Sequence, residues 1–481
     1  MTRLLVGPFN RVEGDLEVNL QIDEGRVTEA WANSPLYRGF ENILQGRPAL
    51  DALVIAPRIC GICSVSQSLA AATALRHAAG ITMPENGMLS ANIAHGAENI
   101  ADHLTHFYLF FMPDFARDIY ADQPWFASIV DRFKATVGTG AAQWLEQRRR
   151  LLHVLGIVAG KWPHSLAFQP GGSTKSIDKG EKIRLLSTVQ DLRRFLETNV
   201  FADNLDAVTE LTNADALFAW ADNHPTGDFA QFLTVSRACD LDTLGQVALP
   251  LMSQGAYHNL EGSLFSRGVF DPATGKRNSV NIDAFSEDLT STWMQGATAH
   301  PANATAHVDA DKDEAYSWCK APRLNAQPVE VGALARQVVD GQALICDLVR
   351  AGKTHVQARI VARLIETARL VSAMEGWVKA LKPGMPFCEE KPMVKTGTGS
   401  GLIEAARGSL GHWLAIKNGQ LSHYQIIAPT TWNFSPRCAA GVAGPLEQAL
   451  VGTPVRAKEH DPIAVQHVVR SFDPCMVCTV H

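Results

Sequence analysis

The feature that most constrains this chain is a pair of Cys-x-x-Cys motifs near opposite ends of the sequence. Cys60 and Cys63 form the first pair, and Cys475 and Cys478 form the second, which is followed closely by His481. Two thiols three residues apart can bind one metal ion, so two such pairs supply four sulfur ligands. If one ion binds all four, the fold must bring both ends of the chain together and bury the second end, because chain ends are otherwise mobile.

The separation of the two pairs limits the kind of metal site. Zinc ribbons place their two pairs within roughly 15–20 residues of each other, whereas almost the whole sequence separates these pairs. We therefore favour a catalytic site assembled from both ends of one domain. Thiolates select zinc, copper(I), iron–sulfur centres or nickel over magnesium and calcium. Structural zinc, a redox disulfide at one pair and two unrelated buried pairs are alternatives that the spacing leaves open.

The composition describes a large globular protein and excludes several classes. The chain has 481 residues, 46% hydrophobic and 19% charged, with a formal net charge of −6. This balance gives no electrostatic case for nucleic-acid binding, and no run of about 20 apolar residues could span a membrane. The first residues lack a signal peptide, and nine scattered cysteines argue for a reducing compartment. We therefore expect a cytoplasmic protein, unless a partner's signal exports it.

Hydrophobic periodicity predicts a mainly α fold with small β elements. Alternation over residues 1–33, with a turn at 23–25, predicts a β-hairpin, and 421–427 is typical of a strand. Several long helical patterns favour a large central bundle of antiparallel helices. The polar, irregular segment 268–330 suggests an excursion from the bundle within a single domain of residues 1–481. The predicted helices span residues 60–80, 90–113, 141–157, 179–201 and 337–381, the last with a weak point at Gly352.

Six stretches of the sequence resemble the large subunit of nickel–iron hydrogenases. The two signatures are Arg58-Ile59-Cys60-Gly61-Ile62-Cys63 and Asp473-Pro474-Cys475-Met476-Val477-Cys478-Thr479-Val480-His481. The other matches are Arg11-Val12-Glu13-Gly14, Tyr37-Arg38-Gly39-Phe40-Glu41, Glu404-Ala405-Ala406-Arg407-Gly408, and Ala428-Pro429-Thr430-Thr431-Trp432-Asn433 followed by Pro436-Arg437. They occur in the family's order, so the resemblance covers essentially the whole chain.

The resemblance implies a nickel–iron centre held by the four cysteines. Cys60 and Cys475 would be terminal ligands of nickel. Cys63 and Cys478 would bridge nickel to an iron that carries two cyanides and one carbon monoxide, Fe(CN)2(CO). Apart from the two bridging sulfurs, no protein atom need touch that iron.

Further residues match family positions around this centre. Arg407 would lie over the metals and donate to a cyanide, held by Asp102 and Asp473, because a guanidinium stays charged and offers a fixed fork of donors. Thr430 and Thr431 carry hydroxyls that could donate to the second cyanide. The residues alone leave ordinary explanations open: a surface arginine, a solvated helix face, a turn aspartate and strand packing.

The resemblance also suggests a proton acceptor and a second metal. Glu13 would lie beside Cys475 and relay the proton that heterolytic cleavage of H2 releases, although a solvated hairpin glutamate is equally consistent with the residues. Glu41, His481 and a backbone carbonyl near Ile427 would bind Mg2+, which prefers oxygen ligands.

Several positions depart from the usual family pattern. Gln67 and Asp15 stand where most relatives have histidine, and Ile62 and Phe110 are bulkier than the residues common in oxygen-inhibited relatives. If the last two line the gas channel, they would narrow it for oxygen more than for hydrogen. These departures resemble the regulatory, hydrogen-sensing branch. His164 could face an iron–sulfur cluster of a partner, or could serve as a capping residue.

The function implied by the resemblance is the reaction H2 ⇌ 2 H+ + 2 e−, used for hydrogen sensing through a histidine kinase. Outside the two pairs the cysteines are isolated, so the iron–sulfur clusters that carry electrons must belong to a small partner subunit. A respiratory uptake hydrogenase is the alternative within the family, and a zinc-stabilised interaction scaffold without redox activity is the alternative outside it. We expect His481 to be either the product of proteolytic processing or the encoded end of the chain.

Overall fold

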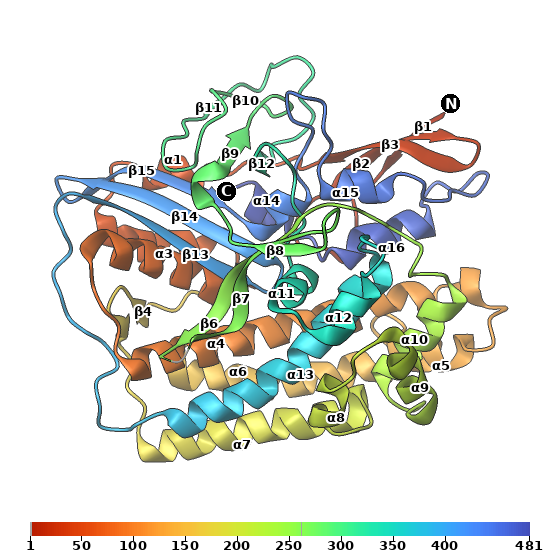
Figure 1. Ribbon diagram of the computed structural model, residues 1–481, viewed down its shortest axis with the longest axis horizontal. Helices are drawn as coiled ribbons and strands as arrows, with labels where there is room; N and C mark the ends of the chain where they lie inside the picture. The colour runs from red at the N-terminus through yellow and green to blue at the C-terminus, as the bar shows by residue number, and fades with distance from the viewer. Residues whose placement is uncertain (1, 261) are drawn as a thin grey trace.

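A bundle of four long helices forms the core of the protein. The computed structural model describes residues 2–260 and 262–481, and its longest helices run side by side across the lower half of Figure 1. Each contacts two of the others, so that the four close a bundle. The mainly α fold with small β elements is therefore confirmed. The four helices are α4 (Glu85–Thr105), α6 (Thr139–Ala159), α7 (Lys179–Phe195) and α13 (Val356–Ala380).

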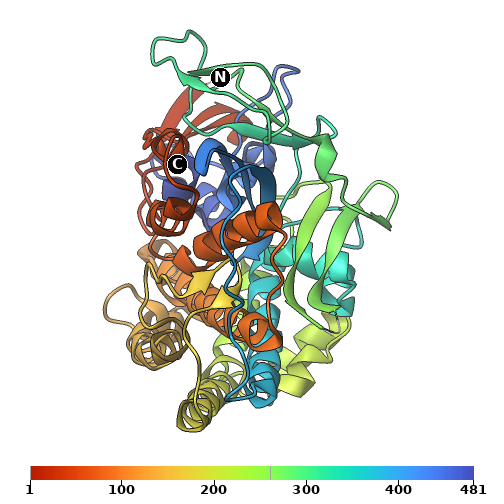
Figure 2. The same cartoon turned by 90° about the vertical axis from the view of Figure 1, so that its left-hand side faces the viewer.

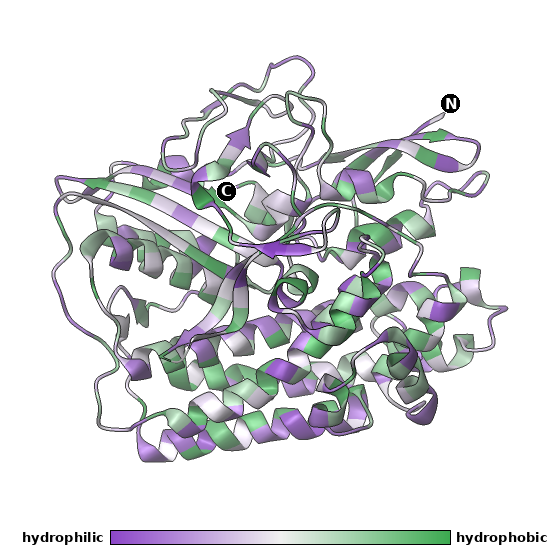
Figure 3. Ribbon diagram, viewed as in Figure 1, coloured by the Kyte–Doolittle hydropathy of each residue, from purple (hydrophilic) through white to green (hydrophobic). Residues whose placement is uncertain are grey.

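Burial distinguishes the outer helices of the bundle from the inner ones. In α7 the buried residues Leu185, Val189 and Leu192 lie on one face, as expected for an amphipathic helix, and Figure 3 shows polar and apolar residues interspersed along it. A capping box formed by Asp178 and Glu181 begins this helix, because their side chains satisfy backbone N–H groups that lack helical partners. By contrast, α4 is buried along almost its whole length, so its polar residues lie in the interior.

Predicted helices differ from the observed ones in two ways, by a change of helix type or by a break. The helix predicted over 179–201 changes from α7 to the π-helix η6 (Leu196–Val200). The pattern over 90–113 continues from α4 into a π-helix, η3 (His106–Phe111), and a 3-10 turn, η4 (Met112–Ala116), at Pro113. The helical pattern over 337–381 is broken in two places, since the chain forms α11 (Ala333–Asp340), α12 (Ala343–Leu348) and α13. The second break contains Gly352, the expected weak point. Gly341, in the left-handed conformation, ends α11, which is the usual role of glycine after a helix.

The predicted hairpin and strand are both present, each within a three-stranded antiparallel sheet. The N-terminal sheet contains β1 (Thr2–Val6), β2 (Glu17–Asp23) and β3 (Arg26–Asn33). The predicted strand is β15 (Gln420–Ile427), which pairs with β14 (Gly408–Lys417) beside β13 (Gly397–Ala405). The strands β13 and β14 were not predicted, because their many glycine and alanine residues give a weak strand pattern.

The polar segment 268–330 is more ordered than its sequence suggests. It begins in the sheet of β6 (Leu251–Asn259), β7 (Gly262–Asp271) and β8 (Lys276–Asn278). It then forms two short pairs, β9 (Phe285–Asp288) with β12 (Ala321–Leu324) and β10 (Met294–Gln295) with β11 (His307–Val308). These pairs lie at the top of the molecule, away from the helix bundle, in both Figure 1 and Figure 2.

Shorter elements complete the chain and carry the motifs. Among the residues that the structure describes, no helix combines the length and apolar character needed to cross a bilayer. The remaining elements are α1 (Phe40–Leu44), η1 (Ala49–Asp51), α2 (Ala52–Ile55), η2 (Ala56–Ile59), α3 (Ser64–Ala79), η5 (Asp118–Tyr120), α5 (Phe126–Phe133), β4 (Phe168–Gln169), β5 (Gly172–Ser173), η6 (Leu196–Val200), α8 (Leu205–Thr209), α9 (Ala214–Asn223), α10 (Asp228–Ala238), η7 (Ile282–Ala284), α14 (Pro429–Asn433), α15 (Pro445–Leu450), α16 (Ile463–Ser471) and α17 (Met476–Thr479).

Glycines let α3 lie directly on strand β13. A Cβ atom at Gly399 would come within 2.1 Å of the Ala74 carbonyl oxygen, and one at Gly401 within 2.0 Å of the Ala70 carbonyl oxygen. Both obstructing atoms belong to the backbone of α3, which could yield only if the whole helix moved. The absence of side chains at these two positions therefore fixes the distance between helix and sheet.

We expect Gly401→Ala to lower stability by about 1–3 kcal/mol, the usual cost of overpacking a well-packed interior. Gly376→Ala is the control, because Gly376 lies inside α13 and an added Cβ there would meet no neighbouring atom within 4 Å. Alanine there should instead add up to about 1 kcal/mol through helix propensity. Thermal unfolding of both variants checks the prediction, and an unchanged melting temperature for Gly401→Ala would contradict it.

Candidate metal centre

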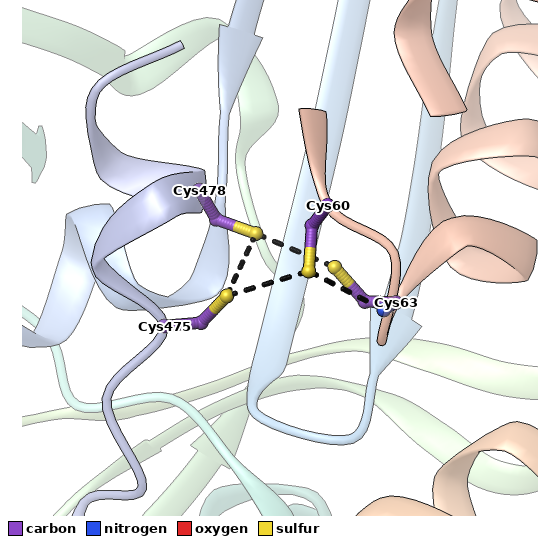
Figure 4. Close-up of side chains that lie close together, drawn as sticks. All are labelled: Cys60, Cys63, Cys475 and Cys478. Carbon is purple, nitrogen blue, oxygen red and sulfur yellow. Dashed lines mark hydrogen bonds between the residues drawn. The ribbon is translucent and has the colours of Figure 1, made fainter. Parts of the chain in front are cut away.

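The two Cys-x-x-Cys pairs meet in the interior, as Figure 4 shows. The Sγ atoms of Cys60 and Cys475 are 3.5 Å apart, and those of Cys63 and Cys478 are 3.3 Å apart. All four sulfurs lie within 4.8 Å of one another, and every one of these residues is buried. In the described part of the chain they are the one group of three or more potential ligands this close together. The fold therefore brings four soft donors from both ends of the sequence to one point.

Helix starts set the local geometry of each pair. Cys60 follows η2, and Cys63 is the N-cap of α3, with its amide 3.5 Å from the Cys60 sulfur. Cys475 is the N-cap of α17, and the amide of Cys478 donates to the Cys475 carbonyl at 3.0 Å. In both pairs a single turn therefore places the two sulfurs on the same side of the backbone.

The segment that carries the second pair is held by the N-terminal region. Glu13 and Cys475 form a parallel backbone bridge, in which the amide of Met476 donates to the Glu13 carbonyl at 2.7 Å. Further along, the amide of Arg38 donates to the Val480 carbonyl at 2.9 Å. These contacts account for the burial of a segment, only partly exposed at Val477, whose position in the sequence would otherwise favour mobility.

The thiols cannot all ionise without a compensating cation. Hydrogen bonding among them lowers the pKa of Cys60 well below its usual value and raises the pKa of Cys63 and Cys475 well above it. One thiolate is thus stabilised at the expense of its neighbours. A divalent metal removes this competition, because coordinated thiols are deprotonated. The buried, all-sulfur donor set therefore fits a soft transition metal.

Arg407 lies beside the cysteines and is fixed on two sides by the predicted carboxylates. Its Nη1 atom is 2.7 Å from Asp102, its Nη2 is 3.2 Å from the Asp473 carboxylate, and its Nε donates to the Asp473 carbonyl at 2.8 Å. Only 4% of the arginine is exposed. Burial would lower the pKa of Arg407, but the two carboxylates and nearby Cys475 and Cys60 raise it well above its usual value. The guanidinium is therefore a permanent cation.

The two carboxylates that hold Arg407 are not equivalent. Burial raises the pKa of Asp102 well above its usual value, despite the nearby guanidinium. At Asp473 burial has the same tendency, but Arg407, His106 and Arg363 lower the pKa overall. Asp473 is therefore the ionised partner. It also adopts a left-handed backbone, with φ of 56°, which aspartate tolerates better than most residues.

The two threonines occupy the short helix α14 and differ in their contacts. The Thr430 hydroxyl accepts a hydrogen bond from the Cys475 amide at 3.1 Å. The Thr431 hydroxyl is completely buried and has no partner among the described residues. An unsatisfied buried hydroxyl is costly, and a ligand carrying an acceptor, such as a metal-bound cyanide, would satisfy it.

Glu13 combines burial with several charged neighbours. Burial raises its pKa above the usual value, Arg407 opposes this, and Cys60 and Asp473 reinforce it. The backbone bridge to Cys475 places this residue at the rim of the thiol group. Glu13 is therefore a carboxyl that can hold a proton beside the cysteines.

The predicted magnesium ligands Glu41 and His481 also meet. Nε2 of His481 lies 3.3 Å from Glu41 and 2.8 Å from the carbonyl oxygen of Ile426, the neighbour of Ile427. Lys320, which the sequence analysis missed, contacts Glu41 at 2.7 Å. Burial opposes ionisation of Glu41, but Lys320 and His481 lower its pKa to about 2. No motif marks Lys320, because it lies in the irregular segment.

The positions that depart from the family pattern, and His164, have different surroundings. Gln67 accepts a hydrogen bond from Nε2 of buried His412 at 2.8 Å, and His164 contacts the Pro57 carbonyl through Nδ1 at 2.9 Å. Ile62 packs against the apolar cluster that contains the four cysteines. Phe110 is half-buried in η3, and Asp15 is exposed.

Comparison with known proteins agrees with this arrangement. Residues 38–123 and 141–481 match the family described as nickel-dependent hydrogenase. The chain is 29% identical to the periplasmic [NiFeSe] hydrogenase large subunit of Desulfomicrobium baculatum, covering 100% of this chain and 95% of that protein. It is 27% identical to the hydrogenase-2 large chain of Escherichia coli (strain K12), covering 100% and 97%.

The fold is similar as well. The crystal structure of a reduced, active form of the Ni-Fe-Se hydrogenase from Desulfomicrobium baculatum superposes with a TM-score of 0.86 at 27% identity and covers 100% of both chains. The match to the family thus extends over most of the sequence, includes both cysteine pairs and is accompanied by a common fold. This chain belongs to the nickel-dependent hydrogenase family and is an oxidoreductase that acts on H2.

Proposed function

We propose that this chain is the large, catalytic subunit of a nickel–iron hydrogenase that cleaves H2 reversibly into protons and electrons. The observation that carries the proposal is the convergence of four buried thiols within 4.8 Å of one another, beside a buried Arg407. Cys60, Cys63, Cys475 and Cys478 would hold the nickel–iron centre. When bound, that centre supplies the redox chemistry by which H2 is split.

The proposed contribution of the other residues is to fix charge and to move a proton. Arg407 directs a permanent positive charge towards the site, where preorganised donors stabilise developing negative charge. Thr431 offers a hydroxyl without a partner among the described residues, and Thr430 holds the backbone of Cys475. Glu13, whose pKa burial raises, receives the proton that cleavage of H2 leaves at the thiols. Arg407 is the alternative proton carrier, but its raised pKa means that it would first have to release its own proton.

A magnesium ion at Glu41 and His481 is part of the proposal. The fit is chemical: a carboxylate and the Ile426 carbonyl offer oxygen donors, and His481 offers an imidazole nitrogen. Lys320 contacts the same carboxylate and neutralises its charge. Mg2+ usually keeps several water ligands, and these would complete its coordination. The ion would fasten the segment carrying the second cysteine pair.

We also propose an iron–sulfur small subunit as the electron-carrying partner. Beyond the four site cysteines, the described cysteines form no group of three or more potential ligands, so electrons need a carrier outside this chain. Leu36, Ile43, Leu50 and Val54 are large apolar side chains exposed in a short segment before the first pair. Exposed apolar surface of this kind is typical of interfaces.

Hydrogen sensing in the cytoplasm, through a histidine kinase, is the more specific function that we propose. It is supported by Ile62, Phe110 and Gln67, which resemble the regulatory branch at three positions. Ile62 and Phe110 would line and narrow the gas channel. The rival is a respiratory uptake hydrogenase, which the similarity to the two hydrogenases named above fits equally well.

Replacement of one proposed ligand tests the metal centre. Cys475→Ala removes a sulfur from the buried group, so we expect loss of nickel and of the infrared bands of metal-bound carbon monoxide and cyanide. Cys438→Ala is the matched control, because Cys438 is also a buried free cysteine and should leave both signals intact. Wild-type protein that contained zinc without nickel would support the scaffold alternative and contradict the proposal.

Glu13→Gln tests the proton acceptor. The amide keeps the shape of the carboxyl but cannot take up a proton, so we expect turnover to fall by roughly 10²–10⁴-fold, the range of general acid–base catalysis. Nickel content and the infrared bands should stay unchanged, since the backbone bridge to Cys475 is retained. Activity near the wild-type value would contradict this role of Glu13 and leave Arg407 as the alternative proton carrier.

Deletion of the gene distinguishes sensing from uptake. A sensor controls other genes, so we expect deletion to abolish hydrogen-dependent expression of the organism's other hydrogenase genes. Complementation with the wild-type gene should restore that expression, whereas complementation with Cys475→Ala should not. Normal expression combined with a loss of hydrogen-supported growth would assign the protein to uptake.

A further inference from the structure

A buried guanidinium other than Arg407 makes contacts with the loop that carries Arg407. Arg336 lies on α11 and is completely buried. Its Nε and Nη2 atoms donate to Glu366 at 3.1 and 2.7 Å, and its Nη1 donates to Glu404 at 2.8 Å. The remaining donors contact the carbonyl oxygens of Ala405 at 2.8 Å and Ala406 at 3.0 Å. All five N–H donors that a guanidinium offers are thereby used.

These contacts hold the tight turn between β13 and β14. Ala405 pairs with Gly408, so Ala406 and Arg407 form a two-residue loop inside the protein. A buried carbonyl must find a donor, and Arg336 supplies one to each of the two residues that precede Arg407. The backbone approach is also close, since a Cβ at Gly408 would lie 2.6 Å from the amide nitrogen of Gly332, at the start of α11.

Glu366 also contacts the helix segment that carries Asp102, the ion-pair partner of Arg407. Glu366, on α13, also accepts a hydrogen bond from Nε2 of His103 at 3.0 Å. His103 directly follows Asp102, whose carboxylate contacts Arg407 at 2.7 Å. Glu366 therefore links the helix segment that carries Asp102 to the arginine that holds the loop of Arg407.

We propose that Arg336, Glu366 and His103 form a positioning network that sets Arg407 and Asp102 relative to each other and to the thiols. Arg336 and His103 fix the two backbone segments, and Glu366 joins them. None of the three is placed among the proposed metal ligands. The inference rests on the proposed role of Arg407 at the metal centre. It adds that Arg336 on α11 and Glu366 on α13 determine the position of Arg407.

A buried ion pair between Arg336 and Glu366 is an expensive way to hold a loop. Replacement of a buried ion pair by apolar residues is often neutral or stabilising, so stability alone does not account for Arg336. Glu366 is kept ionised, because Arg336 and His103 lower its pKa to about 2 against the effect of burial. A charged, fully bonded group restricts geometry more tightly than apolar packing does, and that restriction is useful beside a reacting centre.

Arg336→Lys in the metal-loaded complex with its partner subunit tests the network. Lysine keeps the charge but lacks the planar fork, so the Ala405 and Ala406 carbonyls lose donors and Arg407 shifts. We expect kcat to fall by about 10²-fold, the scale of a 1 Å misplacement, with little change in KM. Nickel content should remain at the wild-type value, and the cyanide infrared bands should shift.

Arg132→Lys is the matched control. Arg132 forms two bonds of 2.7 Å to Asp228, which is 1% exposed, and lies outside the proposed site. This variant should lose stability but keep wild-type kcat and infrared bands. If Arg336→Lys behaved in the same way, or if Arg132→Lys also shifted the bands, the positioning role would be refuted.

A double variant separates this inference from the proposed function. If Arg336 acts through Arg407, Arg336→Lys combined with Arg407→Lys should be no slower than Arg407→Lys alone, because residues of one unit are not additive. Multiplied losses would overturn the network. Wild-type activity of Arg407→Lys would overturn the proposed role of Arg407 itself.

If Arg336→Lys does not fold, Glu366→Gln provides a second test. Glutamine keeps the shape of Glu366, and this variant should give the same shift of the cyanide infrared bands. Unshifted bands would refute the network.

Discussion

Four thiols packed at contact distance in a dry interior repel one another as soon as they ionise, and the surrounding structure compensates for that repulsion. Two unit charges about 4 Å apart interact by about 4 kcal/mol at the effective dielectric constant of a protein. A metal ion removes this cost, and Arg407, with its raised pKa, adds a permanent positive charge nearby. Asp102 and Asp473 then hold the arginine in place. The negative charge of the thiolates is thus balanced by Arg407, and the position of Arg407 depends in turn on the two carboxylates.

This requirement explains why so many charged residues are buried in the protein. Arg336, Glu366 and Glu404 are completely buried around the loop of Arg407, and Lys320 and Glu41 are buried beside the second cysteine pair. Such groups are seldom fully buried unless they are paired, and each of these has at least one partner of opposite charge. The apolar residues of the bundle stabilise the fold, and the buried charged groups fix the positions of the backbone segments around the site.

The sequence predicted the elements with strong local signals and missed those that depend on tertiary contacts. The N-terminal hairpin and the long helices follow from alternation and helical periodicity. The break at Gly341 was missed because the periodicity continues across it, and β13 was missed because its glycines are selected by contact with α3. At the site, the motifs indicated the four cysteines and Arg407. Lys320 and Arg336 belong to no recognised motif, and only the folded chain shows what they contact.

The close contact between α3 and β13 has a consequence for electron transfer. Helix α3 begins directly after Cys63, and β13 ends two residues before Arg407. With the Gly399 and Gly401 backbones against the helix, no intervening side chain can change rotamer and alter the spacing. This contact therefore restrains the first cysteine pair and the guanidinium relative to each other. A redox centre held by such a framework would require little rearrangement of its surroundings, which lowers the activation barrier to electron transfer.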